Sequence, residues 1–568
     1  MRQIAAVLWK DVRALRWELA AWLALNIVLA TARPGLATLE ADLLAGISPF
    51  RALLAEIQAF AALLLAVRVV QIDPLVGTTA AWRTMPLSRG PFLWAKLLLI
   101  AAAVAGGPAL SDCIPAAAVG LRFQDVALAG VFGVAGLSSW AALGVLVGAT
   151  TRSFRQAVLT CLAAVFAVRL FSGFMHPRLN ALALPFGSSW SLQQSQWMAS
   201  NAVLVVCAIV VFIHQQTTSR LERSRVLAGL ALLLTLVVGA TFRWDVWHVF
   251  TTLARASGES RSLDPESLVV EFEPGQGVER TVGRTPRASV MVSTAAETVR
   301  VSGLPDGAWA EVVDVSSTTR FSNGTTLRFD GWPSAAPEGR ETDWGPVGAR
   351  AASISRALDL KVVAWPGPYG DAEPPRAILV QSEEPMFGHI SQFPARLTAD
   401  LRLQAYRYRV ASRGPARCGT HLRASGVSSD VSGVELAPDA SVEVRLRVGL
   451  VQRSTGPLPT LALANTDRRL AVLYPLRVGR GPWRPALEMY GGAFVMAGLT
   501  VQFRSGEFGP HGRWKPASGG DSIDQAFLDG AELVLLEPEY LGSFTRRVEV
   551  ADYRLRRARL VNSIAPAR

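Results

Sequence analysis

The 568-residue sequence contains only four lysines (Lys10, Lys96, Lys361 and Lys515), and none of them follows a glycine. A P-loop for nucleotide phosphates requires Gly-Lys followed by Ser or Thr, so the chain has no P-loop. The basic residues behind the net charge of +12 are almost all arginines, and they do not gather on one soluble face. Because nucleic-acid binding needs such a face, we expect no nucleic-acid partner.

Cysteine and histidine are also scarce. Three of the four cysteines fall in apolar runs and the fourth, Cys418, stands alone, so they form no disulfide framework. The six histidines give no His-Glu-x-x-His helix, and no Gly-x-Ser-x-Gly elbow occurs. We therefore expect no catalytic residue, no metal site and no cofactor site in this chain, which makes a membrane enzyme the least favoured reading.

Charged residues make up only 18% of the chain, whereas 50% are hydrophobic. This composition excludes intrinsic disorder, which requires low hydrophobicity and high charge. Residues 1–242 contain 18 basic and 9 acidic residues, and residues 243–568 contain the remaining 39 and 36. The imbalance indicates a membrane domain followed by a water-soluble domain.

Seven apolar runs are long enough to cross a hydrocarbon core of roughly 30 Å. They lie near residues 17–33, 52–72, 97–119, 126–149, 157–174, 199–215 and 226–242. Pro108, Asp112 and Pro115 interrupt the third run, which predicts a broken or kinked helix. The seventh is short. We expect an α-helical polytopic domain of six to seven transmembrane helices over residues 17–242.

Basic residues mark alternate connections between these runs. They precede the first run and recur between the second and third, the fourth and fifth, and the sixth and seventh. By the positive-inside rule these connections share the cytoplasmic side with the N-terminus. Seven spans then place residues 243–568 outside the cytoplasm.

Residues 1–16 form a separate feature. Apolar residues recur at helical spacing (Ile4, Val7, Leu8, Val12 and Leu15), with charged and polar residues between them. This pattern is typical of an amphipathic helix in the membrane interface. The alternative is a cytoplasmic extension of the first span.

Small and ionisable residues occur inside the apolar runs. Gly144 and Gly148 form a small-xxx-small pair, for which we favour packing within one bundle over dimerisation. Glu56, Asp112 and Arg169 fall in the outer third of their spans and are candidates to line a shared polar cavity. Snorkelling to the interface is the alternative for Glu56 and Arg169.

Residues 73–96 carry a specific pattern, DPLVGTTAAWRTMPLSRGPFLWAK. An aspartate after a span, Gly-Thr, an aromatic, Pro-apolar-Ser-Arg and then Ala-Lys resemble the early cytoplasmic connection of type-2 ABC transporter permeases of the exporter type. The N-terminal LWKDVRALRWEL is similar to the interfacial helix of that family. The resemblance covers residues 1 to about 225. The seventh span and the large C-terminal domain depart from it.

The resemblance implies a permease subunit of an ATP-driven exporter in the bacterial cytoplasmic (inner) membrane, in contact with lipid and paired as a dimer or heterodimer. ATP would bind a separate cytoplasmic ABC ATPase subunit. Trp82 offers an aromatic anchor, Pro86 stiffens the turn and Ser88 caps the next helix. The candidate ATPase-coupling residues are Asp73, Trp82, Arg83, Pro86, Ser88, Arg89 and Lys96. The alternative is that the basic residues here only meet anionic headgroups.

After a linker at 243–262, strand and turn signals predict two β-rich, β-sandwich-like lobes at 263–385 and 386–568. Ser441–Val451 alternates apolar and polar residues, and Leu397–Val410 does so with a phase slip near Ala405 that suggests a bulge. Further strands are predicted at Glu532–Leu536 and Arg547–Val550. Trp332, Trp344 and Trp365 suit either a ligand groove or a core. The domain would bind substrate or partner. The alternative for the whole chain is a membrane-anchored, extracytoplasmic β-rich binding or scaffold protein without transport activity.

Overall fold

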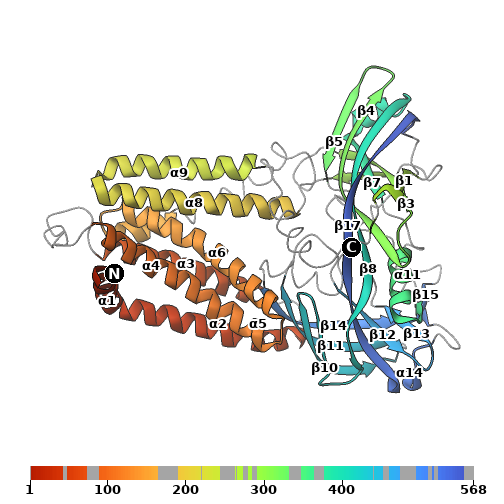
Figure 1. Cartoon of the computed structure of the whole chain (residues 1–568), viewed down its shortest axis with the longest axis horizontal. Helices are drawn as coiled ribbons and strands as arrows, with labels where there is room; N and C mark the ends of the chain where they lie inside the picture. Colours follow the sequence, from red (N-terminus) through yellow and green to blue (C-terminus); the bar gives the residue numbers. More distant parts are fainter. Residues whose placement is uncertain are drawn as a thin grey trace.

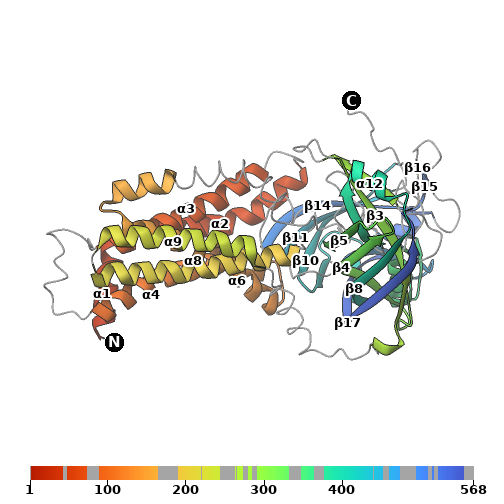
Figure 2. The ribbon, with the colours of Figure 1, turned by 90° about the horizontal axis from the view of Figure 1, so that it is seen from above.

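The chain forms a helical bundle joined to a β-rich region, seen here in a computed structural model (Figure 1). The structure describes residues 2–42, 48–72, 89–163, 190–218, 220–242, 263, 265–272, 279–284, 291–331, 347–363, 376–438, 441–451, 459–473, 494–508, 514–516 and 522–555. The N-terminus lies at the end of the bundle remote from the β-rich region (Figures 1 and 2).

The bundle contains α1 (Arg2–Ala14), α2 (Arg16–Asp42), α3 (Ser48–Gln71), α4 (Arg89–Pro108), α5 (Ile114–Ala118), α6 (Phe123–Thr150), α8 (Trp190–Thr218) and α9 (Leu221–Thr241). A short apolar helix, Phe154–Ala163, follows α6. α6 packs against α3 and α8, and α8 packs against α9. Apolar side chains from α2, α3, α4, α6 and α8 fill the centre of the bundle.

Of the described helices, three are long and apolar enough to cross a membrane: Gly90–Ala118, Phe123–Thr150 and Gln196–Thr218. The bent pair Arg2–Ala14 and Arg16–Thr31 makes a fourth if it is counted as one span. These are fewer than the six to seven expected. The runs near 52–72 and 226–242 form the helices α3 and α9.

The third apolar run is distorted without being broken. α4 passes into a five-residue π-helix, η2 (Ala109–Cys113), and then into α5. Pro108 removes one backbone donor at the entry to η2, and Pro115 removes another in α5. A π segment re-routes the hydrogen bonds while the helix continues. The run therefore continues as one helical segment, Gly90–Ala118, and the break expected as one alternative does not occur.

α6 packs closely on α3 through its glycines. A Cβ atom on Gly144 would lie 2.3 Å from the Leu63 carbonyl oxygen, and one on Gly148 would lie 3.1 Å from the Val70 Cβ. Only a residue without a side chain allows the two backbones to approach so closely. The prediction that this pair packs within the bundle is confirmed.

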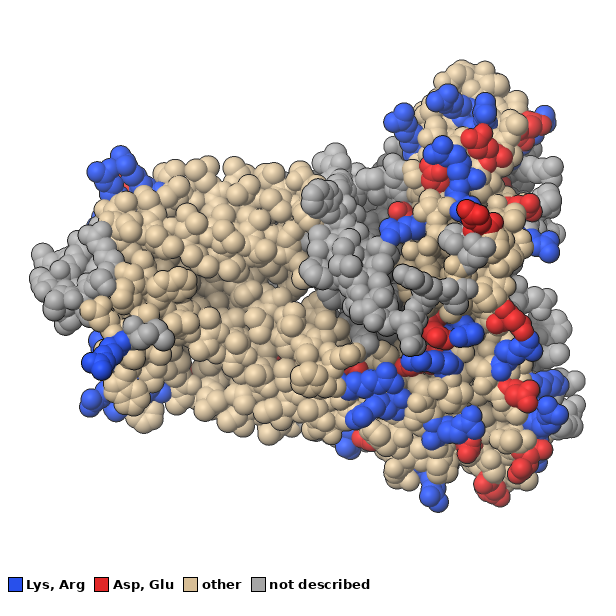
Figure 3. Space-filling model, viewed as in Figure 1, with Lys and Arg blue, Asp and Glu red and all other residues tan. Residues whose placement is uncertain are grey.

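The ends of α3, α6 and α9 that carry the basic connections meet at one end of the bundle. Gln71 donates from Nε2 to Thr151 Oγ1 at 2.7 Å, and Arg225 donates from Nε to the Thr150 carbonyl at 3.2 Å. On the face shown in Figure 3, charged side chains gather at this end and on the β-rich region, with an uncharged bundle between them. Which compartment each end faces stays a prediction.

The β-rich region holds β1 (Val269–Phe272), β2 (Glu279–Arg284), β3 (Met291–Ser302), β4 (Ala308–Phe321), β5 (Thr326–Gly331), β6 (Lys361–Val363), β7 (Arg376–Glu383), β8 (Ala395–Pro415), β9 (His421–Ala424), β10 (Val427–Leu436), β11 (Ser441–Val451), β12 (Thr460–Asn465), β13 (Leu470–Leu473), β14 (Phe494–Arg504), β15 (Gly506–Phe508), β16 (Trp514–Pro516) and β17 (Ala531–Tyr553). Its helices are η3 (Pro265–Ser267), α11 (Val347–Leu358), α12 (Glu384–Ile390) and α14 (Gln525–Asp529).

A seven-stranded sheet in the order β5-β4-β8-β17-β12-β13-β6 organises this region. One four-stranded sheet contains β1, β2, β3 and β7, and a second runs β14-β11-β10-β9. β15 and β16 form a two-stranded ribbon. The large sheet shares one apolar core with the first four-stranded sheet and another with the second, which is a sandwich-like arrangement.

The long strands β8 and β17 pass through both cores. β17 contributes Phe544 to the first core and Leu533 to the second, and β8 contributes Leu401 to the first and packs Ala411 against the second. Strands on either side of residue 386 therefore pair in the same sheet, so the two expected lobes share β-structure across their boundary.

The strand predicted at Ser441–Val451 is confirmed as β11. The strands predicted at 532–536 and 547–550 are parts of one strand, β17, whose pairing with β8 shifts register between Tyr540 and Gly542. The phase slip near Ala405 marks a change of buried face in β8: Leu403 and Ala405 belong to the first core, whereas Tyr406 and Tyr408 on the opposite face pack with Trp309. The extra residue of the bulge, Leu541, belongs to β17 and not to β8.

Candidate functional site

The candidate ATPase-coupling segment borders the start of α4. Asp73, Trp82, Arg83, Pro86 and Ser88 lie outside the described residues. Arg89 is the first residue of α4. Lys96, two turns further along the same helix, is fully buried.

Lys96 forms a buried ion pair with Asp11 of α1. Lys96 Nζ lies 3.1 Å from Asp11 Oδ2, and neither side chain is exposed. Lys10, which is about half exposed, places its Nζ 3.3 Å from Asp11 Oδ1. Lys96 Nζ also lies 5.2 Å from the centre of the Phe92 ring. The Lys-Asp motif of the N-terminal segment and the Ala-Lys motif near the start of α4 thus contact each other in the folded chain.

Apolar contacts also hold α1 against α4. Val7 of α1 packs with Phe92 and Ala95 of α4, next to Ile4 and Leu8. The chain then bends by 75° between α1 and α2, at Leu15. Leu15 is fully buried and packs with Val69 of α3 and Leu99 of α4. α1 is therefore fixed to α4 by both an ion pair and an apolar face.

The three predicted intramembrane residues differ in their surroundings. Glu56 of α3 is exposed, Asp112 of η2 is only 9% exposed, and Arg169 lies outside the described residues. A Cβ atom on Gly133 of α6 would lie 2.4 Å from Asp112 Oδ2, so Asp112 faces α6 closely. The cavity shared by all three residues stays a prediction.

Uncharged polar residues form a buried network that the sequence analysis missed. Gln58 of α3 donates from Nε2 to Asn26 Oδ1 of α2 at 2.7 Å and to Ser111 Oγ of η2 at 3.0 Å. Asn26 in turn donates from Nδ2 to the Trp22 carbonyl at 2.8 Å. The network joins α2 and α3 to the π-helix, where irregular backbone often marks a functional region.

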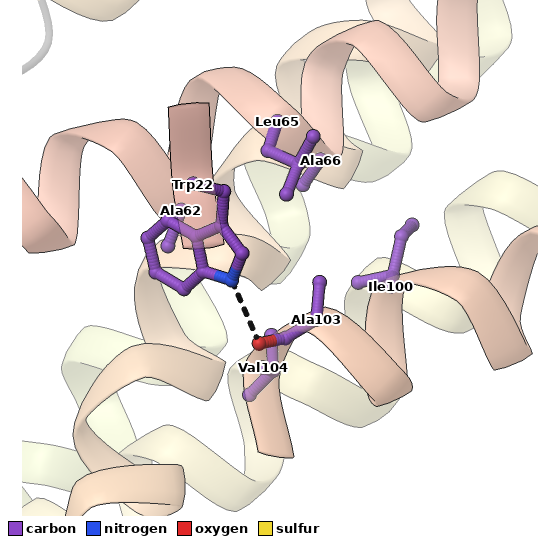
Figure 4. A pocket seen from close by; sticks show the side chains of 7 residues that line it. All are labelled: Trp22, Ala62, Leu65, Ala66, Ile100, Ala103 and Val104. Atoms are coloured by element: carbon purple, nitrogen blue, oxygen red, sulfur yellow. Dashed lines mark hydrogen bonds between the residues drawn. The ribbon is translucent and has the colours of Figure 1, made fainter. Parts of the chain in front are cut away.

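A small apolar pocket lies between α2, α3 and α4 (Figure 4). Trp22 lines it and donates from Nε1 to the Ala103 carbonyl of α4 at 3.2 Å. Ala62 and Ala66 of α3 and Val104 of α4 form other parts of its wall. Small side chains thus leave the packing between α3 and α4 incomplete at this point.

The signal for this network was present but weak. Asn26, Gln58 and Ser111 stand inside otherwise apolar runs, where any polar side chain needs a partner. Only ionisable residues were singled out from the sequence. Because the three residues are far apart in the chain, no spacing rule relates them.

A buried cluster of aromatic and charged side chains lies between α11 and the large sheet of the β-rich region. Arg350 of α11 lies 4.6 Å from the centre of the Trp309 ring and forms an ion pair with Glu311. Tyr406 and Tyr408 pack against Trp309 at 5.1 and 5.9 Å between ring centres. Burial lowers the pKa of Arg350 and raises that of Tyr408. The cluster fixes α11 on the large sheet.

The tryptophans proposed as a groove, Trp332, Trp344 and Trp365, lie outside the described residues. Within the described part of the chain, no group of three or more His, Cys, Asp or Glu side chains is arranged to hold a metal ion. Comparison of the sequence with models of known protein families finds no match, and comparison with curated proteins finds none either.

Proposed function

We propose that this protein is the membrane-spanning permease subunit of an ATP-driven exporter of the type-2 ABC class. A separate cytoplasmic ATPase drives it and binds the ATP, since the chain has no P-loop. The β-rich region lies outside the cytoplasm and binds substrate or a partner. Two permease subunits, identical or different, assemble around one pathway.

The observation that carries this proposal is the buried Lys96–Asp11 pair. A permease driven by a partner needs a stiff route from the cytoplasmic connection into its helices. The pair holds α1 against the first turns of α4. That helix directly follows the connection that resembles the family's coupling segment. A push on residues 73–88 would therefore move α1 and α4 together.

The arrangement of the bundle supports the proposed topology. In this proposal α3, α9 and residues 157–174 also cross the membrane, which brings the count to six or seven. The basic connections meet at one end of the bundle and the β-rich region joins the other. Under the positive-inside rule the first end faces the cytoplasm.

The test is copurification of the ATPase with full-length protein in mild detergent. Trp82→Ala and Arg89→Glu are expected to reduce the recovered ATPase at least about tenfold, as expected for loss of an aromatic or arginine hot spot. Membrane insertion should be unchanged. In inside-out vesicles the same variants should lose ATP-dependent export.

Two substitutions serve as matched controls. Trp94→Ala removes a tryptophan that is 60% exposed on α4, and Arg152→Glu reverses an exposed charge in the connection after α6. Both should retain the ATPase. Recovery of the ATPase with Trp82→Ala and Arg89→Glu at the wild-type level would exclude residues 73–96 as the coupling segment. Absence of any ATPase from wild-type preparations would favour an anchored scaffold without transport.

A further inference from the structure

Glu537 of β17 connects three parts of the fold where the β-rich region meets the bundle. Its side chain is only 4% exposed. Arg409 of β8 donates to Oε1 from Nη2 at 2.6 Å and from Nε at 2.9 Å. The backbone N–H of Ser425 donates to Oε2 at 2.9 Å, and Arg122 Nη2 lies 3.7 Å from the same oxygen. Arg122 belongs to the turn between α5 and α6.

A second carboxylate lies beside this group. Asp125, in the first turn of α6, is fully buried and accepts a hydrogen bond from the Gly426 N–H at 3.2 Å. Ser425 and Gly426 form the turn between β9 and β10. This turn therefore donates to one carboxylate from the β-rich region and to another from the bundle. The Ser428 hydroxyl adds a hydrogen bond to the Val119 carbonyl.

The surfaces around these groups fit closely. A Cβ atom on Gly449 of β11 would lie 2.5 Å from the Val119 side chain. Gly120 has a φ of +77°, and a Cβ atom there would lie 2.9 Å from Arg423 Nη2. Val451 packs in a buried apolar cluster with Leu121 of the turn. The β-rich region thus rests on the α5–α6 turn through both polar and apolar contacts.

We propose that Glu537 is a joint that fixes the β-rich region to the α5–α6 turn, so that this region and the helices α4 to α6 move as one body. The joint requires an ionised carboxylate, because two positively charged side chains approach it. Arg409 comes from the β-rich region, and Arg122 comes from the bundle. This inference concerns the attachment alone and does not depend on the proposed exporter function.

The charged groups around Glu537 decide its response to acid. Arg409 and Arg122 face it directly, Asp125 lies across the β9–β10 turn, and Glu539 pairs with Arg407 two residues along β17. Burial alone would raise the pKa of Glu537, but the Ser425 N–H, Arg409 and Arg122 outweigh it and hold the pKa below its ordinary value of 4.5. With a lowered folded-state pKa, the stabilisation is complete at neutral pH and is lost as the pH falls through that pKa.

Hydrogen–deuterium exchange on the full-length protein in lipid nanodiscs at neutral pH tests the joint. Glu537→Gln removes the charge but keeps the shape. It should speed exchange at residues 119–126 and 425–428 by about tenfold or more, since a hydrogen bond to a charged group is lost there. Residues 460–465 and 531–536, in the centre of the large sheet, should stay protected.

Glu539→Gln is the matched control, because Glu539 lies on the same strand as Glu537 and pairs with Arg407 of β8 at 2.9 Å, but is partly exposed. It should leave exchange at both segments unchanged. Wild-type exchange in Glu537→Gln, or equal acceleration in Glu539→Gln, would overturn the joint. If Glu537→Gln also speeds exchange at residues 531–536, the sheet itself has been disturbed, and the variant Arg122→Glu then tests the joint. That side chain is 39% exposed, so its reversal should free 119–126 while the sheet stays protected, and unchanged exchange there would refute the proposal.

Discussion

Replacing Lys96 with methionine is expected to lower the free energy of unfolding by about 3–5 kcal/mol, because it removes the buried partner of a buried carboxylate. Asp11 is 0% exposed, and its remaining ion-pair partner among the described residues would be the half-exposed Lys10. The loss should appear as a lower melting temperature in detergent. α1 should also become sensitive to protease.

Lys10→Met is the control for this substitution. Lys10 approaches the same carboxylate at 3.3 Å, but its side chain is 48% exposed. Exposed ion pairs are worth about 0–1 kcal/mol, so the effect should be small. The double variant Lys96→Met with Asp11→Asn should recover much of the lost stability, because no charge is then left unpaired. Equal effects of Lys96→Met and Lys10→Met would show that the buried pair does not hold α1.

Gly144→Leu is expected to destabilise the bundle by about 1–3 kcal/mol or more, since overpacking a tight contact forces backbones apart. Its Cβ atom would lie 2.3 Å from a backbone oxygen of α3, which has no freedom to rotate away. The predicted result is a lower melting temperature with the oligomeric state unchanged. Thermal unfolding and size-exclusion chromatography with light scattering measure the two quantities.

Gly136→Leu, on the same helix, provides the comparison. A Cβ atom at Gly136 meets nothing within 4 Å. This variant should therefore melt close to wild type. A change of oligomeric state in Gly144→Leu without loss of thermal stability would mean that the glycine pair faces another copy of the chain.

Some elements of the fold could be predicted because their signal is local. In β11 the buried residues Val442, Val444, Leu446 and Val448 alternate with half-buried or exposed ones, so the sequence alternates and the bounds of the strand agree with the prediction. The distortion near residue 110 follows from Pro108 and Pro115. The sequence predicts two strands within β17 because Pro538 and the bulge at Leu541 interrupt its pattern, although the strand continues through both.

The candidate site was only partly accessible from the sequence. Lys96 was singled out for its place in a pattern, but its burial and its partner were not foreseen. Asn26, Gln58 and Ser111 carry no charge and so escaped notice. Glu537 and Asp125 were not singled out from the sequence, because nothing in the neighbouring residues marks them as buried. In each case the function of the side chain depends on a residue remote in the chain.

The sequence by itself determined the division into an apolar helical part and a charged β-rich part, because hydropathy and alternation depend on neighbouring residues. It also determined the absence of a P-loop. Only the tertiary structure decided that α1 locks onto α4, that a polar network surrounds the π-helix, and that two cores share β8 and β17. The attachment of the β-rich region to the α5–α6 turn belongs to the same group. These features rest on contacts between residues up to several hundred positions apart, and such pairings leave no periodic trace in the chain.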